Sequence, residues 1–268
     1  MEYRRLGKTE EKVSVIGMGT WRIGVYSRPE ERADQVRALK RGIELGINLI
    51  DTAELYAAGR SEEVVGEAVK GTREQVFIAS KVSPEHLMYD DVLTACERSL
   101  KRLGTSYLDL YQVHWPNPSV PIQQTMKAME NLVAAGKVRH IGVSNFDVGL
   151  MEEARSSLSK VDVVSNQVEY SLRSRGAEEE ILPYCERESL TLIAYSPLGR
   201  GNISRLGISL DALSRRNVTP AQAALSWVTR SQQVVAIPKA ARVDHLEENA
   251  ASASLRFTEA EYDQIASR

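Results

Sequence analysis

Short apolar runs and longer amphipathic stretches alternate along most of this 268-residue chain. Runs such as 47–50 (INLI) and 108–113 (LDLYQV) are typical of parallel strands buried on both faces. Stretches such as 30–45 carry apolar residues at helical spacing. The pattern predicts strands at 15–18, 47–50, 76–80, 108–113, 138–143, 162–167, 190–194 and 234–237. Eight strands alternating with helices, in about this length, predict a closed (β/α)8 TIM barrel.

Two segments lie outside this count. Residues 2–14 predict a β-hairpin with its turn at 8–10, which we expect to cover the bottom of the barrel. Residues 258–267 predict an extra C-terminal helix, opened by a capping box of Thr258 and Glu261. Ser61 and Thr219 carry N-cap signals for two barrel helices. Because no linker rich in Pro, Gly and Ser divides the chain, we expect a single domain over 1–268.

The charge composition argues against a large anionic partner. The 34 basic and 36 acidic residues are interspersed, which gives no electrostatic footprint for nucleic acid or an anionic membrane. The N-terminus lacks the apolar segment of a signal peptide, and no run reaches the ~18 apolar residues of a membrane span. We therefore expect a cytoplasmic protein, monomeric by default, with a small partner. Cys96 and Cys185 are expected to be reduced structural thiols.

The loop after the first strand begins like a dinucleotide-binding fingerprint but does not complete it. It reads GMGTWR from Gly17, so that Arg22 stands where the third glycine belongs, and the next helix starts late, near Pro29. A Rossmann-type phosphate site is therefore not expected. The chain has no Walker loop, HExxH or GxSxG motif, and its four histidines lack metal-ligand spacing. Metal catalysis and serine hydrolysis have no sequence support.

Four polar residues, Asp51, Tyr56, Lys81 and His114, follow the second, third and fourth predicted strands. The C-terminal ends of parallel barrel strands meet at one rim, so these side chains should converge. A tyrosine hydroxyl titrates near ~10, and it needs a nearby cation to exchange a proton at neutral pH. Lys81 would supply the cation, held by Asp51 in an ion pair. With His114 donating to a substrate oxygen, the set would protonate a carbonyl oxygen as it becomes an alkoxide.

Each of the four residues also has an ordinary structural interpretation. Asp51 is compatible with a cap, Tyr56 with a loop aromatic, Lys81 with a surface charge and His114 with a core histidine. A second alternative is a lyase or isomerase with a Schiff-base lysine. That chemistry would place Lys81 in an apolar pocket without Asp51, and the presence of Asp51 predicts a charged lysine instead.

At this level of detail the chain resembles the aldo-keto reductase superfamily, from the first strand to about Asn249. The stretch 51–70 (DTAELYAAGRSEEVVGEAVK) is similar to the family's motif with the catalytic aspartate and tyrosine. The pair Ser80-Lys81 carries its lysine, and 99–116 (SLKRLGTSYLDLYQVHWP) ends in its histidine segment. Later matching blocks are GKVRHIGVSNF (136–146), NQVEYSL (166–172), AYSPLGRG (194–201) and IPKA (237–240).

The resemblance implies a reductase that transfers hydride from a nicotinamide cofactor to a small aldehyde or ketone, reversibly. Tyr56 would be the general acid, Lys81 and Asp51 would lower its pKa, and His114 would orient the carbonyl. The cofactor would lie extended over the barrel rim. The residues implied to hold it are Ser144, Asn145, Gln167 and Tyr195 at the nicotinamide, Gly19 and Thr20 at the ribose, Ser196, Leu198 and Gly199 at the pyrophosphate, and Lys239, Glu248 and Asn249 at the adenosine.

The sequence departs from the family pattern at the adenosine end. Many members carry a serine after IPK and an arginine several residues later, where this chain has Ala240 and His245. Lys239 remains as a cation, and Arg242 is a candidate substitute because one arginine can bind a phosphate through two hydrogen bonds. We favour NADP(H) as the cofactor, with NAD(H) as the alternative.

Trp21 and Trp115 directly follow the first and fourth strands and predict an apolar substrate wall, whereas Trp227 lies in a helix and is expected in the core. The loop after strand four is brief, the segment 201–209 is short, and little follows the last helix. Short loops predict an open pocket that accepts many aldehydes. The alternative from another class is a non-catalytic or slow barrel that binds nicotinamide nucleotide in a regulatory role.

Overall fold

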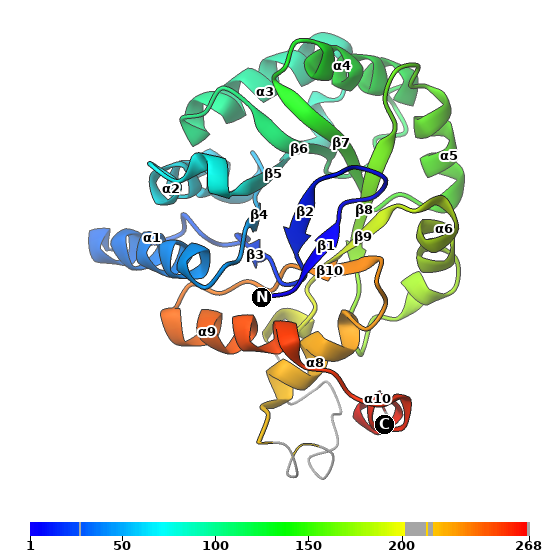
Figure 1. The fold of residues 1–268 in the computed structure, drawn as a ribbon. Coiled ribbons are helices and arrows are strands. Elements are labelled where there is room, and N and C mark those ends of the chain that lie inside the picture. Colours follow the sequence, from blue (N-terminus) through cyan, green and yellow to red (C-terminus); the bar gives the residue numbers. More distant parts are fainter. Residues whose placement is uncertain (27, 202–212, 214–216, 267–268) are drawn as a thin grey trace.

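The computed structural model describes residues 1–26, 28–201, 213 and 217–266. Eight parallel strands follow one another around the barrel in chain order (Figure 1). Gly17 N donates to Ala236 O at 2.8 Å and Ala236 N donates to Val15 O at 2.9 Å, so the first and last strands also join. The predicted closed barrel is therefore confirmed. Its strands are β3 (Met18–Gly19), β4 (Leu49–Asp51), β5 (Phe77–Val82), β6 (Leu108–Val113), β7 (Val138–Ser144), β8 (Val163–Glu169), β9 (Thr191–Tyr195) and β10 (Val234–Ala236).

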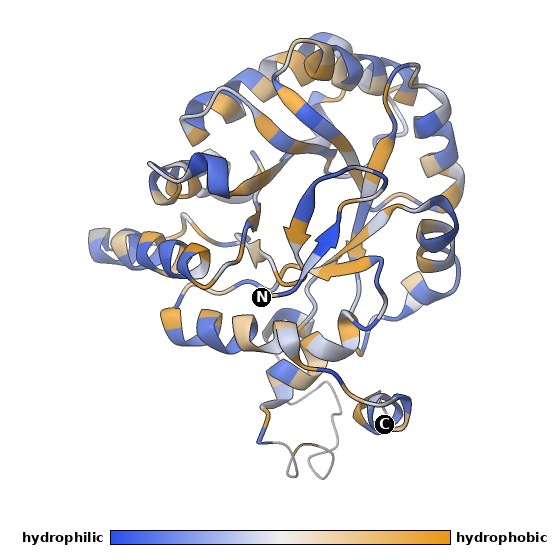
Figure 2. Ribbon diagram, viewed as in Figure 1, coloured by the Kyte–Doolittle hydropathy of each residue, from blue (hydrophilic) through white to orange (hydrophobic). Residues whose placement is uncertain are grey.

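Helices surround this barrel and cover the apolar outer faces of its strands (Figure 2). The helix at 89–103 shows how the sequence sets the bounds. Asp90 and Asp91 lie in its first turn, Lys101 and Arg102 in its last turn, and Gly104 ends it at a φ of 64°. The helices of the barrel are α1 (Pro29–Glu44), α2 (Arg60–Ala68), α3 (Tyr89–Leu103), α4 (Ile122–Ala134), α5 (Val148–Ser156), α6 (Ile181–Glu188), α8 (Pro220–Val228) and α9 (Val243–Ala251).

The predicted N-terminal hairpin is present as β1 (Tyr3–Arg5) and β2 (Lys12–Ser14), which pair antiparallel. It lies across one end of the barrel (Figure 1). Leu6 and Val13 are fully buried against side chains from the barrel interior, including Leu49 and Phe77. A Cβ at Gly7 would lie 2.7 Å from Val164 O, so the turn requires glycine for its close approach as well as for its φ of 54°. The hairpin closes the bottom of the barrel and leaves the other end for a ligand.

Two of the three predicted helix caps are confirmed. α10 (Glu259–Ala266) follows a capping box in which Thr258 N donates to Glu261 Oε2 at 2.7 Å. Position 267 of that prediction lies outside the described residues. Thr219 forms a capping box with Gln222 at the start of α8. The prediction for Ser61 was wrong, because α2 begins at Arg60 with Gly59 at the N-cap position, and the buried Ser61 hydroxyl donates to Thr20 Oγ1 at 2.8 Å instead.

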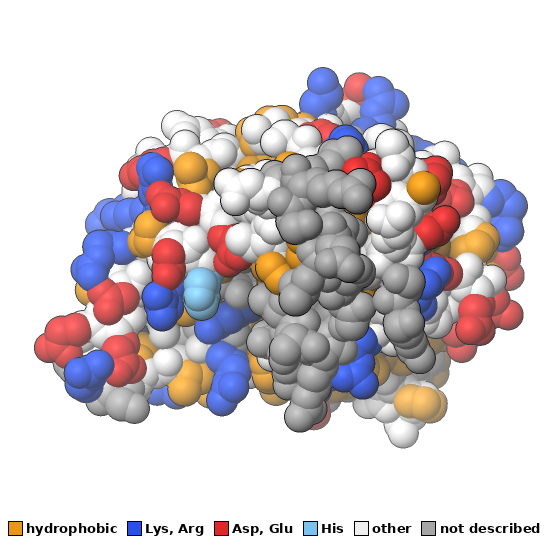
Figure 3. All heavy atoms as spheres, turned by 90° about the horizontal axis from the view of Figure 1, so that it is seen from below, with side chains coloured by type: hydrophobic (Ala, Val, Ile, Leu, Met, Phe, Trp, Pro, Cys, Tyr) orange, Lys and Arg blue, Asp and Glu red, His pale blue; other side chains and the backbone are white. Residues whose placement is uncertain are grey.

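The cysteine prediction is confirmed, because Cys96 and Cys185 are both buried and free. Burial raises the pKa of each thiol to about 12, which removes the thiolate needed for nucleophilic chemistry. Trp227 is also in the core as expected, at 2% exposure. In the part of the chain that the structure describes, no helix has the length and apolar character to cross a membrane. Acidic and basic side chains are mixed on the face seen in Figure 3, in line with the small net charge.

Candidate active site

A cavity of about 690 Å³ opens at the C-terminal ends of the barrel strands, away from the hairpin. Its volume suits a small-molecule site, for which ~300–1,000 Å³ is typical. Lys81 lies just beneath the cavity, and Gly199, Arg242, Glu248 and Asn249 are not part of its lining. The remaining sequence-predicted residues line it: Asp51, Tyr56 and His114, Gly19 and Thr20, Ser144, Asn145, Gln167, Tyr195, Ser196, Leu198 and Lys239, and Trp21 and Trp115.

A fully buried ion pair forms the floor of the cavity. Lys81 Nζ, at the end of β5, donates to Asp51 Oδ1 of β4 at 2.6 Å and to Thr52 O at 2.9 Å. The two side chains are 0% and 2% exposed. Burial lowers the pKa of Lys81, but the charges of Asp51 and Tyr56, together with the hydrogen bonds to both, outweigh burial and the net shift is upward. Lys81 therefore stays charged, which contradicts a Schiff-base role and agrees with the sequence interpretation.

Two glutamine side chains hold the second oxygen of the same carboxylate. Gln167 Nε2 donates to Asp51 Oδ2 at 2.7 Å, and Gln112 Nε2 donates to it at 3.3 Å. Gln112 is fully buried in β6 and was not among the residues predicted from the sequence. The available signal was a polar side chain in an otherwise buried strand, where it needs a partner. Asp51 is thus fixed by donors on both oxygens.

Tyr56 projects over this floor. Its hydroxyl lies 3.4 Å from Lys81 Nζ, and Lys81 Nζ is 5.0 Å from the centre of the Tyr56 ring. Burial raises the pKa of Tyr56, the charge of Lys81 lowers it and that of Asp51 raises it, with a net upward shift. Lys81 thus lowers the pKa of Tyr56 as expected, whereas Asp51 raises it against the expectation, and burial makes the net shift upward. A phenol that stays protonated at neutral pH is suited to give a proton rather than to take one.

His114 faces Tyr56 from the end of β6. The two rings meet edge to face, with their centroids 5.5 Å apart. Burial, assisted by the charge of Lys81, lowers the pKa of His114 to about 3. The ring is therefore neutral at physiological pH. Its Nδ1 atom is buried, and the described part of the chain offers it no hydrogen-bond partner. A buried N–H group without an acceptor costs more free energy than a buried acceptor nitrogen without a donor. We therefore assign the proton to Nε2, which can then donate into the cavity.

This buried histidine predicts a pH dependence of stability. The unfolded chain binds a proton at His114 near pH 6.5, whereas the folded protein binds it only near pH 3. Between these values the unfolded state holds more protons, so the free energy of unfolding should fall as the pH falls. Urea unfolding at several pH values should show a shallower fall in His114→Gln than in the wild type. The exposed His245→Gln should keep the wild-type slope, and equal slopes in all three proteins would contradict the prediction.

The loop that carries Tyr56 is anchored by two buried carboxylates on either side of it. Glu54 Oε1 accepts from Ser83 N at 2.8 Å. Glu62 is 0% exposed and binds Arg102 Nε at 2.6 Å, and the Arg102 side chain packs against Gly59. Neither carboxylate was predicted as a site residue. Their surface-like position in a helix and a loop gave no local signal. The packing of α2 on α3 brings Glu62 to Arg102, and the pairing of β4 with β5 brings Glu54 to Ser83.

A hydrogen-bonded chain lines the wall opposite Tyr56. Tyr195 Oη donates to Asn145 Oδ1 at 3.0 Å, and Asn145 Nδ2 donates to His114 O at 3.1 Å and to Ser144 Oγ at 3.0 Å. Ser144 Oγ in turn donates to Gln167 O at 2.9 Å. Ser144, Asn145 and Gln167 therefore form one polar surface beside the Tyr195 ring, as the family resemblance implied. Amide and hydroxyl groups next to an aromatic ring fit a flat carboxamide-bearing ligand.

Backbone conformation also marks the cavity. Eight described residues other than glycine have a positive φ. Five of them line the cavity: Arg22, Ala57, Asn145, Ser196 and Arg200. Left-handed backbone at such residues costs free energy and tends to concentrate at functional sites. This signal is independent of side-chain chemistry, and it identifies the same end of the barrel.

The adenosine end differs from the sequence expectation. Lys239 lines the cavity as predicted, and so does His245. Arg242, by contrast, is exposed outside the lining, where its Nε donates to Asp244 Oδ1 at 3.0 Å.

At the rim, Trp21 and Trp115 are 51% and 47% exposed and line the cavity as the predicted apolar wall. The segment 201–209, on which part of the open-pocket prediction depended, falls mostly outside the described residues.

Comparison with known proteins agrees with this geometry. Residues 15–268 match the model of the Aldo/keto reductase family. The chain belongs to the aldo/keto reductase family. It is 44% identical to the methylglyoxal reductase YeaE of Escherichia coli (strain K12) over 251 residues. The aligned region covers 92% of this chain and 87% of that protein. The family membership and the enzyme class expected from the sequence are thereby confirmed.

Two solved reductases have nearly the same fold. The thermostable aldo-keto reductase Tm1743, solved with the inhibitor epalrestat, is 41% identical with a TM-score of 0.93, covering 100% of this chain and 99% of its own. An aldo-keto reductase of Klebsiella pneumoniae, solved with NADPH, is 41% identical with a TM-score of 0.91, covering 99% of this chain and 95% of its own. The NADPH complex agrees with the prediction of an NAD(P)H-dependent carbonyl reductase that favours NADP(H).

Proposed function

We propose that this aldo/keto reductase uses NADPH to reduce small uncharged aldehydes, with methylglyoxal-type oxoaldehydes as the first candidates. The observation that carries the proposal is the approach of Tyr56, Lys81 and His114 at one floor of the cavity, with the Tyr56 hydroxyl 3.4 Å from Lys81 Nζ. The relative in Escherichia coli that is named a methylglyoxal reductase supports the substrate class.

The residues of the cavity fit the cofactor. Ser144, Asn145 and Gln167 would hold the carboxamide and Tyr195 would lie against the ring, because these polar and aromatic groups share one wall. When bound, the reduced nicotinamide supplies hydride to the carbonyl carbon. Lys239 would contact the phosphate-bearing adenosine end. The roles of Thr20, Ser196 and Leu198 as further contacts rest on their place in the lining.

The side chains of the floor would supply the proton and the orientation. The Nε2–H of neutral His114 would donate to the carbonyl oxygen and place it beside Tyr56. As charge develops on that oxygen, the Tyr56 hydroxyl would transfer its proton to it, and Lys81 would stabilise the resulting phenolate. Asp51 fixes the position of Lys81, and Gln112 and Gln167 fix Asp51. The product alcohol then carries the proton on oxygen and the hydride on carbon.

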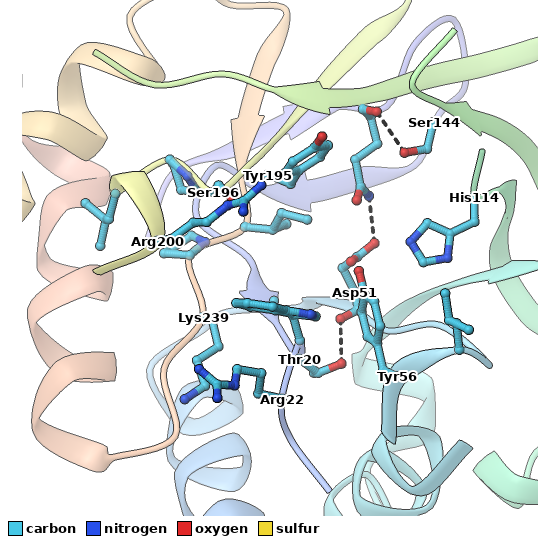
Figure 4. Close-up of a pocket in the computed structure, with 18 of the residues that line it drawn as sticks. Thr20, Arg22, Asp51, Tyr56, His114, Ser144, Tyr195, Ser196, Arg200 and Lys239 are labelled. Carbon is cyan, nitrogen blue, oxygen red and sulfur yellow. Dashed lines mark hydrogen bonds between the residues drawn. The ribbon is translucent and has the colours of Figure 1, made fainter. Parts of the chain in front are cut away.

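The substrate end of the cavity suits an uncharged carbonyl. Trp21, Leu55 and Trp115 give it an apolar rim, and each of these side chains is about half exposed. The basic side chains of the lining that Figure 4 labels, Arg22, Arg200 and Lys239, lie on the side away from His114. A carboxylate on the substrate would therefore lack a cationic partner and would lose hydration on entering.

The test is NADPH consumption with methylglyoxal, an uncharged aromatic aldehyde and anionic glyoxylate. We expect turnover with the first two and a kcat/KM at least about tenfold lower for glyoxylate, equivalent to roughly 1.4 kcal/mol in the transition state. Preference for glyoxylate would overturn the substrate class. Tight NADPH binding without turnover of any aldehyde would overturn the enzymatic proposal and favour a regulatory nucleotide-binding barrel.

A further inference from the structure

The cavity has a cationic end that the catalytic residues do not use. Arg22, Arg200, Lys239 and His245 all line it. Among the described lining residues Asp51 is the only acidic one, and its carboxylate is already bound by Lys81, Gln112 and Gln167. Arg200 Nη2 lies 3.9 Å from Glu169 Oε2. Within the described residues, neither Arg22 nor Lys239 has a carboxylate partner at ion-pair distance, so both cations are candidates to bind an anionic group of a ligand.

Arg22 and Lys239 point into the same region of the cavity (Figure 4). The backbone explains why. Gly19 forms a parallel bridge with Lys239, and Gly19 N donates to Pro238 O at 3.2 Å, so the loop after β3 is joined to the segment after β10. The charge of Arg22 contributes, after burial, to a lowered pKa of Lys239. Two cations held near each other in this way are stabilised when an anion binds between them.

The loop also restricts the arginine. Arg22 has a φ of 67°, and its guanidinium carbon lies 5.5 Å from the centre of the Trp21 ring. A guanidinium that contacts an aromatic ring keeps its N–H groups available for a phosphate. Arg242, the substitute expected from the sequence, instead binds Asp244 outside the lining.

We propose that Arg22, with Lys239, binds the 2′-phosphate of NADP(H) and so replaces the arginine that this chain lacks at His245. The inference rests on the proposed function for the identity of the ligand. It assigns the preference for NADPH over NADH to a residue of the loop after the first barrel strand, where the sequence carries only an incomplete dinucleotide motif.

The test is nucleotide binding, measured by quenching of tryptophan fluorescence without substrate. The variant Arg22→Asn is suitable because asparagine tolerates a left-handed backbone, so the loop can keep its conformation. We expect its Kd for NADPH to rise about tenfold to a hundredfold, the range of one charge-assisted contact, and its Kd for NADH to change less than about twofold. Arg22→Lys should lie between. Arg37→Gln removes an exposed arginine on α1 as the matched control.

The results separate this inference from the proposed function. An equal loss of NADPH and NADH affinity in Arg22→Asn would place Arg22 at the pyrophosphate and overturn the inference. Unchanged NADPH affinity, or a wild type that binds both nucleotides equally, would also overturn it. Aldehyde reduction by the wild type and by Arg37→Gln reports on the proposed function alone, because Arg37 lies outside the cavity lining.

Discussion

Tyr56→Phe should lower kcat for aldehyde reduction by about 10²- to 10⁴-fold, the usual contribution of a general acid. The substitution removes only the hydroxyl that faces Lys81 Nζ at 3.4 Å and keeps the ring that contacts His114. NADPH binding should persist, because the polar wall of Ser144, Asn145 and Gln167 is untouched. Steady-state kinetics combined with fluorescence quenching by NADPH would measure both effects. Loss of NADPH binding together with activity would instead indicate a structural role for the hydroxyl.

The matched control is Tyr89→Phe, which removes a hydroxyl that binds Asn131 on the outer helices. It should retain wild-type kcat. The pH profile provides a further check on Tyr56. Because burial raises its pKa above the ordinary value of 10, kcat for reduction should stay level through the neutral range and fall only when strongly alkaline pH removes the proton. A fall of kcat near neutral pH would contradict a raised pKa at this residue.

Lys81→Met should both abolish reduction and destabilise the fold. It leaves the Asp51 carboxylate, 2% exposed, without its cation. Breaking a buried ion pair in this way typically costs about 3–5 kcal/mol, since an uncompensated charge remains. Urea unfolding would give the change in free energy of unfolding, and the loss of activity should be at least as large as in Tyr56→Phe. Unchanged stability would mean that the two glutamine donors are enough to hold the carboxylate.

The double variant Asp51→Asn with Lys81→Met distinguishes the two consequences. With no unpaired charge left in the floor, it should recover much of the stability that the single variant loses, and the two changes should be strongly non-additive. Its activity should stay low, because no cation remains to stabilise the Tyr56 phenolate. Recovery of activity along with stability would show that Lys81 serves only the fold.

The barrel and the location of its site follow from local features of the sequence. The alternation of apolar runs with helical stretches is a local property of the chain, and parallel strands of a barrel necessarily bring their C-terminal ends together. Asp51, Tyr56, Lys81 and His114 are therefore assigned to one rim by their positions after successive strands. Local signals also suffice for the hairpin and for the capping boxes at Thr219 and Thr258, whose partners are a few residues away.

The tuning of these groups, and the identity of the residues that join them, depend on tertiary contacts. The pKa of Tyr56 follows from the balance between burial and the charge of Lys81, and the burial of a residue cannot be deduced from its neighbours in the sequence. Gln112 has the position of an ordinary strand residue, and only the folded barrel brings its amide to Asp51. Arg22 and Lys239 lie near opposite ends of the chain, and they meet because the last strand closes the barrel against the first. Charge and solvation act through space between residues that are distant in the sequence. Tertiary contacts therefore set the chemistry of the rim, whereas the local pattern of apolar and polar residues determines where the rim lies.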